Sequence, residues 1–327
     1  MSGKLRIGII GCGDFLRLRA ADLLSSRQVE VKLLYSPVNS ANAERYAEIF
    51  GAKAADSPEA IINDPEIDVV CVFVPPFVRK EYVLAAAKAG KQIVATKPLA
   101  ADLSDAREMT EAVEQAGVRC GVIYRRTNNP VIEAYEEIFS GGEFGKLALY
   151  KQDWLHHYPT WNRWATDPKK NGGPFMDAML HNLNAARYLM GRRVVGRVFF
   201  SDDHTHSLAC DDTQFLKVDF EQGASAHLFI TWAAELAVYD SAKNDREHID
   251  QCFMVTDQGW LFRNEIREGK AVITATRNGL EKDFPVIPFE ETFFDRYAKE
   301  IKNRDILPAD LPDIREAYED LRILLEN

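Results

Sequence analysis

The sequence lacks the cysteine pattern of a disulfide-stapled or zinc-binding protein. It has 5 cysteines, widely spaced, and none of them forms a Cys-x-x-Cys pair. This spacing is typical of reduced thiols, which persist in the cytosol. The N-terminal residues reach a glycine turn before any apolar stretch of signal-peptide length. We therefore expect a cytoplasmic protein.

A long hydrophobic run is also missing. The most apolar segment, residues 69–78, contains Pro75 and Pro76, and a bilayer-spanning helix needs about 20 apolar residues. Positive charge is scarce as well, because 40 Lys and Arg face 50 Asp and Glu, for a net charge of −10. An acidic surface repels nucleic acid and anionic membranes. We expect neither as a partner, although a local site can still hold a small anion.

The first part of the chain alternates short apolar runs with helical patterns. "LRIGIIG", "VEVKLLY", "IDVVCVFV", "QIVAT" and "VRCGVIY" are expected strands, separated by segments of helical periodicity. The near-continuous apolar character of residues 67–74 is typical of a parallel sheet covered on both faces. The alternation predicts a doubly wound α/β Rossmann domain over residues 1–123.

The pattern changes after Tyr124. Residues 194–275 contain several strand-like runs separated by turn residues, and two helices are expected near residues 291–302 and 313–325. There is no internal repeat and no low-complexity linker. We predict a second, α+β domain over residues 124–327, with a large, open and mainly antiparallel sheet, joined to the first without a flexible tether.

The glycine turn "IGIIGCGDFL" predicts a dinucleotide site. Gly11-x-Gly13 follows an expected strand and opens an expected helix, whose N-terminus favours a pyrophosphate. The third position of the pattern is Leu16 rather than glycine or alanine, and a purely structural turn is the alternative. The predicted cofactor contacts are Gly11, Gly13, Asp14, Phe15, Leu16, Ser36, Val74, Pro75, Lys97 and Pro98.

The end of the second expected strand bears on the choice of cofactor. An Asp or Glu there reads the ribose 2′-hydroxyl of NAD, but the sequence has Ser36. Because no carboxylate would repel a 2′-phosphate, NAD and NADP both stay open, with a slight preference for NADP. Arg17, Arg19 and Arg45 are the nearby cations. An ordinary turn serine without ribose contact is the alternative.

Lys97 ends the fifth expected strand and is followed by Pro98. Ligands of a doubly wound sheet bind at the carboxyl ends of its strands, so this lysine is expected to face the reactive end of the cofactor. Pro98 restricts the path of the chain and allows a cis bond. An exposed lysine in a turn is the competing interpretation.

Asp177 and His181 stand four residues apart in an expected helix, where they share one face. An imidazole held by a carboxylate is a suitable proton acceptor, while a helix with a polar face is the simpler interpretation. Two metal sites are less favoured alternatives: Asp177 and His181 with the His156–His157 pair, and His204 and His206 near Cys210 and Asp211. We predict no metal.

Together these segments resemble one family, that of glucose–fructose oxidoreductase, inositol dehydrogenase and MocA (Gfo/Idh/MocA). "VPPFVRKEYVLAAAKAGKQIVATKPLA" resembles the family's segment that ends in Glu-Lys-Pro. "WATDPKKNGGPFMDAMLHNLNAARYLMG" resembles its glycine-rich turn and catalytic helix. The resemblance covers nearly the whole chain. Five positions depart from the pattern: Thr96 replaces the glutamate of Glu-Lys-Pro, Arg79 replaces a common histidine, and Ala165, Pro174 and Met179 are also atypical.

The resemblance implies an NAD(P)-dependent oxidoreductase that acts on a secondary alcohol or ketone of a sugar, sugar derivative or cyclitol. It implies that Lys97, Asp177 and His181 are catalytic. The substrate contacts expected with it are Lys97, Tyr124, Arg126, His156, Trp164, Asp177 and His181. A homodimer or homotetramer through the second-domain sheet is expected. An NAD-dependent glycosidase using transient oxidation and a non-catalytic sugar or dinucleotide sensor are the alternatives.

Overall fold

A computed structural model of the chain describes residues 3–156, 164–205, 207–234, 248–303 and 311–326. The chain divides into two compact units, the first formed by Met1–Asn128 and Phe289–Asn327 and the second by Asn129–Pro288. The division differs from the predicted ranges 1–123 and 124–327 mainly at the C-terminus. The last two helices pack with the first unit, a long-range contact that periodicity in the sequence does not reveal.

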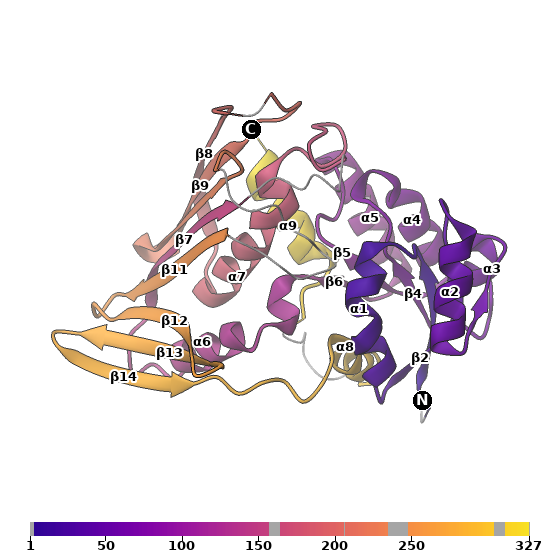
Figure 1. The fold of residues 1–327 in the computed structure, drawn as a ribbon, viewed down its shortest axis with the longest axis horizontal. Coiled ribbons are helices and arrows are strands. Elements are labelled where there is room, and N and C mark those ends of the chain that lie inside the picture. The colour runs from indigo at the N-terminus through magenta and orange to yellow at the C-terminus, as the bar shows by residue number, and fades with distance from the viewer. Residues whose placement is uncertain (1–2, 157–163, 206, 235–247, 304–310, 327) are drawn as a thin grey trace. The chain divides into compact units, whose positions relative to one another are not determined.

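The first unit has a six-stranded parallel sheet with the strand order β3-β2-β1-β4-β5-β6, which confirms the predicted Rossmann arrangement (Figure 1). The order reverses between β1 and β4, where such sheets bind dinucleotides. The strands are β1 (Leu5–Ile10), β2 (Val29–Tyr35), β3 (Lys53–Ala54), β4 (Val69–Val72), β5 (Gln92–Thr96) and β6 (Cys120–Ile123).

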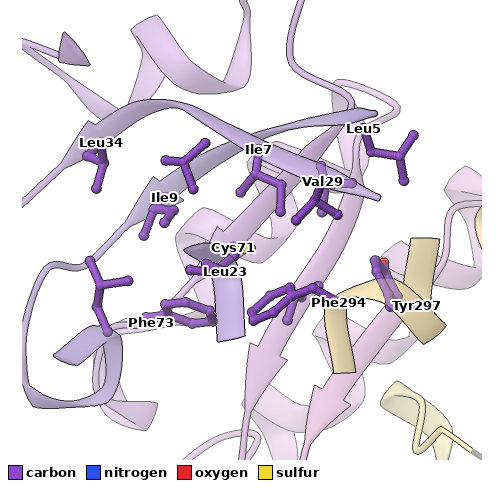
Figure 2. Packing of buried hydrophobic residues seen from close by; sticks show 14 of the residues in the cluster. Leu5, Ile7, Ile9, Leu23, Val29, Leu34, Cys71, Phe73, Phe294 and Tyr297 are labelled. Atoms are coloured by element: carbon purple, nitrogen blue, oxygen red, sulfur yellow. The ribbon is translucent and has the colours of Figure 1, made fainter. Parts of the chain in front are cut away.

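Helices cover both faces of this sheet because successive side chains of a strand point to opposite sides. Ile7 and Ile9 of β1 belong to a buried cluster that also includes residues of α1, α2 and α8, and Figure 2 shows Phe294 of α8 beside Phe73 and Leu23. Gly8 instead faces Ile61 of α3. The helices of this unit are α1 (Asp14–Ser25), α2 (Ser40–Phe50), α3 (Pro58–Ile62), α4 (Lys80–Lys88), α5 (Leu103–Ala116), α8 (Phe293–Lys302) and α9 (Ile314–Leu325).

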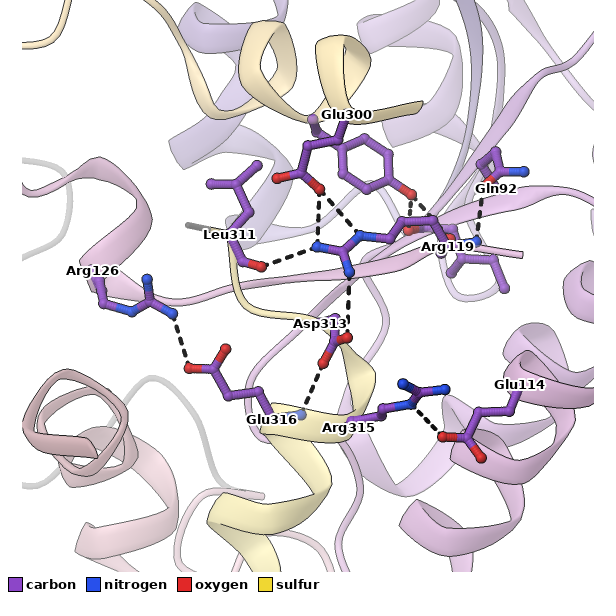
Figure 3. A network of polar contacts seen from close by, with 11 residues as sticks. Gln92, Glu114, Arg119, Arg126, Glu300, Leu311, Asp313, Arg315 and Glu316 are labelled. Carbon is purple, nitrogen blue, oxygen red and sulfur yellow. Dashed lines mark hydrogen bonds and ion pairs between the residues drawn. The ribbon is translucent and has the colours of Figure 1, made fainter. Parts of the chain in front are cut away.

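Specific contacts attach α8 to the Rossmann sheet. The hydroxyl of buried Tyr297 donates to the carbonyl oxygen of Ile93 at 2.5 Å. Its ring lies where a Cβ on Gly121 would come within 2.7 Å, so the glycine in β6 permits this close packing. Arg119 then pairs with Glu300 of α8 at 2.9 Å and with Asp313 at 3.3 Å (Figure 3). These contacts explain why the C-terminal helices belong to the first unit.

The second unit is built on an eight-stranded sheet with the order β14-β13-β12-β11-β7-β10-β9-β8. Among the described strands of this sheet, only β7 and β10 pair in parallel; the other pairs are antiparallel, as predicted. The strands are β7 (Leu147–His156), β8 (Val194–Asp202), β9 (Thr213–Phe220), β10 (Ser225–Thr231), β11 (His248–Thr256), β12 (Leu261–Arg267), β13 (Lys270–Arg277) and β14 (Leu280–Pro285).

One face of this sheet is covered by α6 (Pro130–Ser140) and α7 (Leu180–Met190), which contact β7, β10 and β13 (Figure 1). Leu216 of β9 and Leu228 of β10 are fully buried and stand opposite each other. Their neighbours Phe215 and Phe229 point to the opposite face and are only partly buried. The alternation gives the second unit an open sheet face. Among the described residues, no helix has the length and apolar character that a membrane crossing requires.

Asp295 of α8 ties this helix to the loop before β2. Its carboxylate accepts hydrogen bonds from the Ser26 hydroxyl at 2.6 Å and from the Arg27 amide at 2.9 Å. With Thr292 it also forms a reciprocal cap at the start of α8. Burial alone would raise the pKa of Asp295, but the hydrogen bonds from Ser26, Thr292 and Arg27 outweigh it and hold the pKa below its ordinary value.

We therefore expect Asp295→Asn to lower the free energy of unfolding at pH 7 by about 2 kcal/mol, the scale of lost charge-assisted hydrogen bonds. Because the folded-state pKa is depressed, this stabilisation is present above the unfolded-state pKa of about 4 and is lost as the pH falls through the folded value. Urea titrations between pH 3 and 7 measure it. The control Glu59→Gln, an exposed acid in α3, should change stability by less than about 0.5 kcal/mol. Equal losses in the two variants at every pH would contradict the prediction.

Candidate active site

The glycine turn after β1 lies directly against the end of β4. Gly11 has a φ of +106°, and a Cβ there would come within 2.7 Å of the backbone carbonyl of Phe73. Gly13 is different, because a Cβ at this position would meet nothing within 4 Å. Gly13 precedes α1, and no side chain caps the N-terminus of that helix. An open space over uncapped amide groups suits a pyrophosphate, so these residues fit a dinucleotide.

The residues that follow the turn have distinct roles. Phe15 packs edge-on against Phe73 with ring centroids 5.0 Å apart, and Leu16 is fully buried. The third position of the glycine pattern therefore contributes to the core. Asp14 is exposed and pairs with Arg17 at 3.4 Å. Burial raises the pKa of Cys12 to about 12, so this thiol stays protonated within the turn.

Ser36 follows β2, as predicted, and its hydroxyl oxygen accepts the Asn39 amide at 3.4 Å. Asn39 in turn caps α2 by accepting from the amide of Ala41. The guanidinium of Arg45 lies 4.8 Å from the ring centroid of Tyr46. The Ser36 turn therefore carries no carboxylate of its own at the position where such folds read the ribose.

Lys97 lies at the carboxyl end of β5 and is partly buried. Its peptide bond to Pro98 is cis, the isomer that the sequence allowed. Both neighbours, Thr96 and Pro98, are buried. Val74 and Pro75 follow β4, the strand adjacent to β5. The cofactor is predicted to bind at the carboxyl ends of the strands, and this side of the sheet carries Lys97, Pro98, Val74 and Pro75.

Arg79 connects the loops at the carboxyl ends of β4 and β5, a structural role that the sequence did not indicate. Its guanidinium is buried and donates to the carbonyl oxygens of Thr96, at 2.6 Å, and Val74, at 2.7 Å. The carbonyl oxygen of Pro98 and that of Leu99, at 3.0 Å, are further acceptors. One side chain therefore joins the loop after β4 to the turn that carries Lys97. The only sequence signal was the departure from the family histidine at this position.

Two predicted substrate contacts of the first unit, Tyr124 and Arg126, are almost fully buried. Arg126 pairs with Glu316 of α9 at 2.9 Å (Figure 3). Tyr124 offers its carbonyl oxygen to the hydroxyl of Thr127 at 2.6 Å. The ion pair with α9 gives Arg126 a role inside the first unit, which the sequence missed because Glu316 is distant along the chain.

In the second unit, the expected catalytic helix begins with a π-helical turn, η3 (Phe175–Met179), which continues into α7. Asp177 lies on the π-helical turn and His181 in the first turn of α7, and both are partly buried. The sequence predicted one regular helix. Single π-helical turns are rare and occur often at functional sites.

The start of this helix is anchored to β9. Gly172 and Gly173 have φ values of +80° and +101°, and a Cβ on Gly173 would stand 3.2 Å from the carbonyl oxygen of Asp211. The buried side chain of Gln214 accepts the Phe175 amide at 2.7 Å. These contacts fix the turn that carries Asp177, and the glycine pair was their only sequence signal.

The remaining predicted residues are described only in part. Trp164 is partly buried in a turn. His156 ends β7, while its side chain, His157 and His206 lie outside the described residues. Within the described ranges, no group of three or more His, Cys, Asp and Glu side chains is arranged to hold a metal ion.

The first unit therefore has the features of a dinucleotide-binding domain, and Arg79 holds the turn that carries Lys97 in place. The second unit is an open-sheet domain in which Asp177 and His181 lie at the start of a helix. Comparison with known families agrees with this description. Residues 5–124 match the "Oxidoreductase family, NAD-binding Rossmann fold" model, and residues 132–245 match the "GFO/IDH/MocA C-terminal domain" model. The chain belongs to the Gfo/Idh/MocA oxidoreductase family. The predictions of family, fold and NAD(P)-dependent oxidoreductase class are confirmed.

Characterised relatives align over most of the chain. The scyllo-inositol 2-dehydrogenase (NAD(+)) of Bacillus subtilis is 24% identical over 93% of this chain and 86% of its own length. The myo-inositol 2-dehydrogenase of Thermotoga maritima is 28% identical over 91% of this chain and 86% of its own length. The aldose-aldose oxidoreductase of Caulobacter crescentus, solved with glycerol, has a TM-score of 0.81 at 18% identity, covering 98% of this chain and 95% of that one. That structural similarity shows a shared fold.

The two glycines of the turn should respond differently to a methyl group. Gly13→Ala should fold normally, because its Cβ enters open space, but should weaken NAD(P)H binding by about tenfold or more, because the backbone must approach the pyrophosphate there. Gly11→Ala should lower Tm, because its Cβ would clash with the Phe73 backbone at a positive φ. Thermal unfolding with and without cofactor separates the two effects. Unaltered cofactor affinity in Gly13→Ala would argue against a pyrophosphate at this turn.

Proposed function

We propose that this oxidoreductase transfers a hydride between nicotinamide and a secondary alcohol or ketone of a sugar, sugar derivative or cyclitol. The observation that carries the proposal is the similarity to two inositol dehydrogenases over 93% and 91% of the chain. The chain also keeps Lys97, Asp177 and His181, the acid–base residues that the family resemblance implies.

Each residue of this set suits one part of the reaction. Bound nicotinamide would accept or supply the hydride. His181 takes the hydroxyl proton during oxidation and returns it during reduction, and Asp177 orients its imidazole. Lys97 supplies the positive charge that stabilises the developing alkoxide. Tyr124, His156 and Trp164 are proposed to line the substrate pocket, whereas the ion pair of Arg126 with Glu316 favours an indirect role for that arginine.

For the cofactor, we propose a preference for NADP(H). The support is the absence of an acid after β2, where Ser36, Pro37, Val38 and Asn39 follow one another, since a carboxylate there would repel the 2′-phosphate. The Bacillus subtilis relative is named for NAD+, so both cofactors belong in any assay.

We also propose that the protein is cytoplasmic and forms a homodimer or homotetramer. All five cysteines are free thiols, which suits a reducing compartment. The support for self-association is the open sheet face of the second unit, defined here as the side chains of Val198, Phe200, Phe215, His227 and Phe229. Phe200 is 59% exposed and stacks on Phe215. Exposed Phe200 and the partly buried Phe215 and Phe229 lie in a row across three neighbouring strands, and aromatic residues gathered in this way are typical of a protein interface.

A panel of sugars and inositols, tested with NAD(H) and NADP(H), examines the proposed activity. We expect turnover with at least one polyol or keto-sugar, and Lys97→Met should reduce kcat by about 10² or more while leaving cofactor affinity nearly intact. The matched control is Lys88→Met, which alters an exposed lysine at the end of α4 and should retain normal turnover. Full activity of Lys97→Met would exclude the proposed mechanism, and failure to bind either cofactor would exclude the activity.

Self-association should depend on the open sheet face. Phe200→Asp places a charge among aromatic side chains and should shift the protein toward the monomer, because an unpaired charge is costly to bury. Light scattering at micromolar concentration measures the mass. Ile287→Asp, at a highly exposed loop position after β14, should leave the oligomer intact. A wild-type protein that scatters as a monomer would contradict the proposal.

A further inference from the structure

Arg79 places a charged group in the interior of the first unit. Its side chain is only 1% exposed. Nη1 donates to the carbonyl oxygens of Thr96, Pro98 and Leu99, and Nη2 donates to the carbonyl oxygen of Val74 and to the Thr96 hydroxyl, both at 2.7 Å. Every acceptor is a neutral oxygen, and Nε has no hydrogen-bond partner among the described residues.

Among the residues that the structure describes, the charge on Arg79 is therefore stabilised by carbonyl and hydroxyl dipoles and not by an anion. Burial lowers the pKa of Arg79 to about 9, so the guanidinium is still protonated at neutral pH. Carbonyl oxygens from two loops point at it and stabilise it, but they carry no net charge. Its field consequently extends to groups bound nearby, because a buried charge is screened less than an exposed one.

The position of Arg79 indicates which part of a bound dinucleotide would interact electrostatically with its charge. The adenosine ribose is read after β2, and the pyrophosphate lies at the glycine turn after β1. In the strand order β2-β1-β4-β5, the nicotinamide half falls on the β4 and β5 side. Arg79 hydrogen bonds to the loops at the carboxyl ends of these two strands, including the carbonyl oxygens of Thr96 and Pro98 on either side of Lys97.

The two redox forms of the cofactor differ in charge at this end. The oxidised nicotinamide ring carries a positive charge, and the reduced ring is neutral. We propose that Arg79 is a fixed buried cation that makes the site bind the reduced cofactor more tightly than the oxidised one. Because the bound oxidised ring is destabilised, it accepts a hydride more readily, which favours oxidation of an alcohol over reduction of a ketone within the site. This inference rests on the proposed function of the same site. It adds no chemical step, because the hydride still passes from the carbinol carbon to the oxidised ring and the hydroxyl proton to His181.

The test is the ratio of Kd for the oxidised cofactor to Kd for the reduced one, measured by tryptophan fluorescence and calorimetry without substrate. Thr96→Glu puts a carboxylate where the Thr96 hydroxyl now accepts from Arg79 and should lower the ratio by about tenfold, the scale of a unit charge several ångströms away in a protein interior. Arg79→Gln should lower it to a similar degree.

The matched controls are Thr96→Val, which removes the hydroxyl without adding charge, and Arg79→Lys, which keeps the charge. Both should retain the wild-type ratio, and thermal unfolding checks that each variant is folded. A folded Thr96→Glu or Arg79→Gln protein with the wild-type ratio would overturn the inference. If neither Thr96→Glu nor Arg79→Gln folds, the ratio of Kd for the oxidised to Kd for the reduced cofactor in the wild-type protein is the test. A ratio of about ten or more supports the inference, and a ratio of one or less overturns it. Failure of both cofactor forms to bind would instead reject the proposed function.

Discussion

The close contact between the glycine turn after β1 and the backbone after β4 is the constraint on which the cofactor half of the molecule depends. At Gly11 the two backbones are so near that a single Cβ would clash with Phe73. This contact brings the start of α1 to the point where the strand order reverses. The uncapped amide groups of α1 and the loops after β4 and β5 consequently lie together at the carboxyl ends of the strands.

Much of the fold could be predicted because local patterns determine it. The apolar strands of the first sheet are flanked by helices of regular periodicity, and the alternation of Leu216, Val218 and Phe220 with half-buried neighbours marks a one-sided strand of the second sheet. The position of α8 and α9 could not be predicted. It depends on Tyr297 fitting against Gly121 and on ion pairs of Arg119, contacts between residues far apart along the chain.

The candidate site was predictable to the extent that its residues form motifs. The glycine turn and the lysine before Pro98 lie where the sequence placed them, at the ends of β1 and β5. The π-helical turn at Asp177 was missed, because it depends on contacts of the turn with β9, including Gln214, and not on helix propensity. Arg79 was missed as a structural residue because arginines are mostly exposed, and only the tertiary structure surrounds this one with carbonyl groups.

Arg79 and Thr96 show how a departure from a family pattern can be understood physically. A carboxylate at position 96 would pair with the guanidinium and neutralise its charge. With threonine, the hydroxyl completes the set of neutral acceptors, and the guanidinium has no carboxylate partner within the described part of the chain. The same guanidinium also holds the carbonyl groups on both sides of Lys97. The position of Lys97 and the electrostatic potential around it therefore depend on one side chain, so a change at position 79 or 96 alters both together.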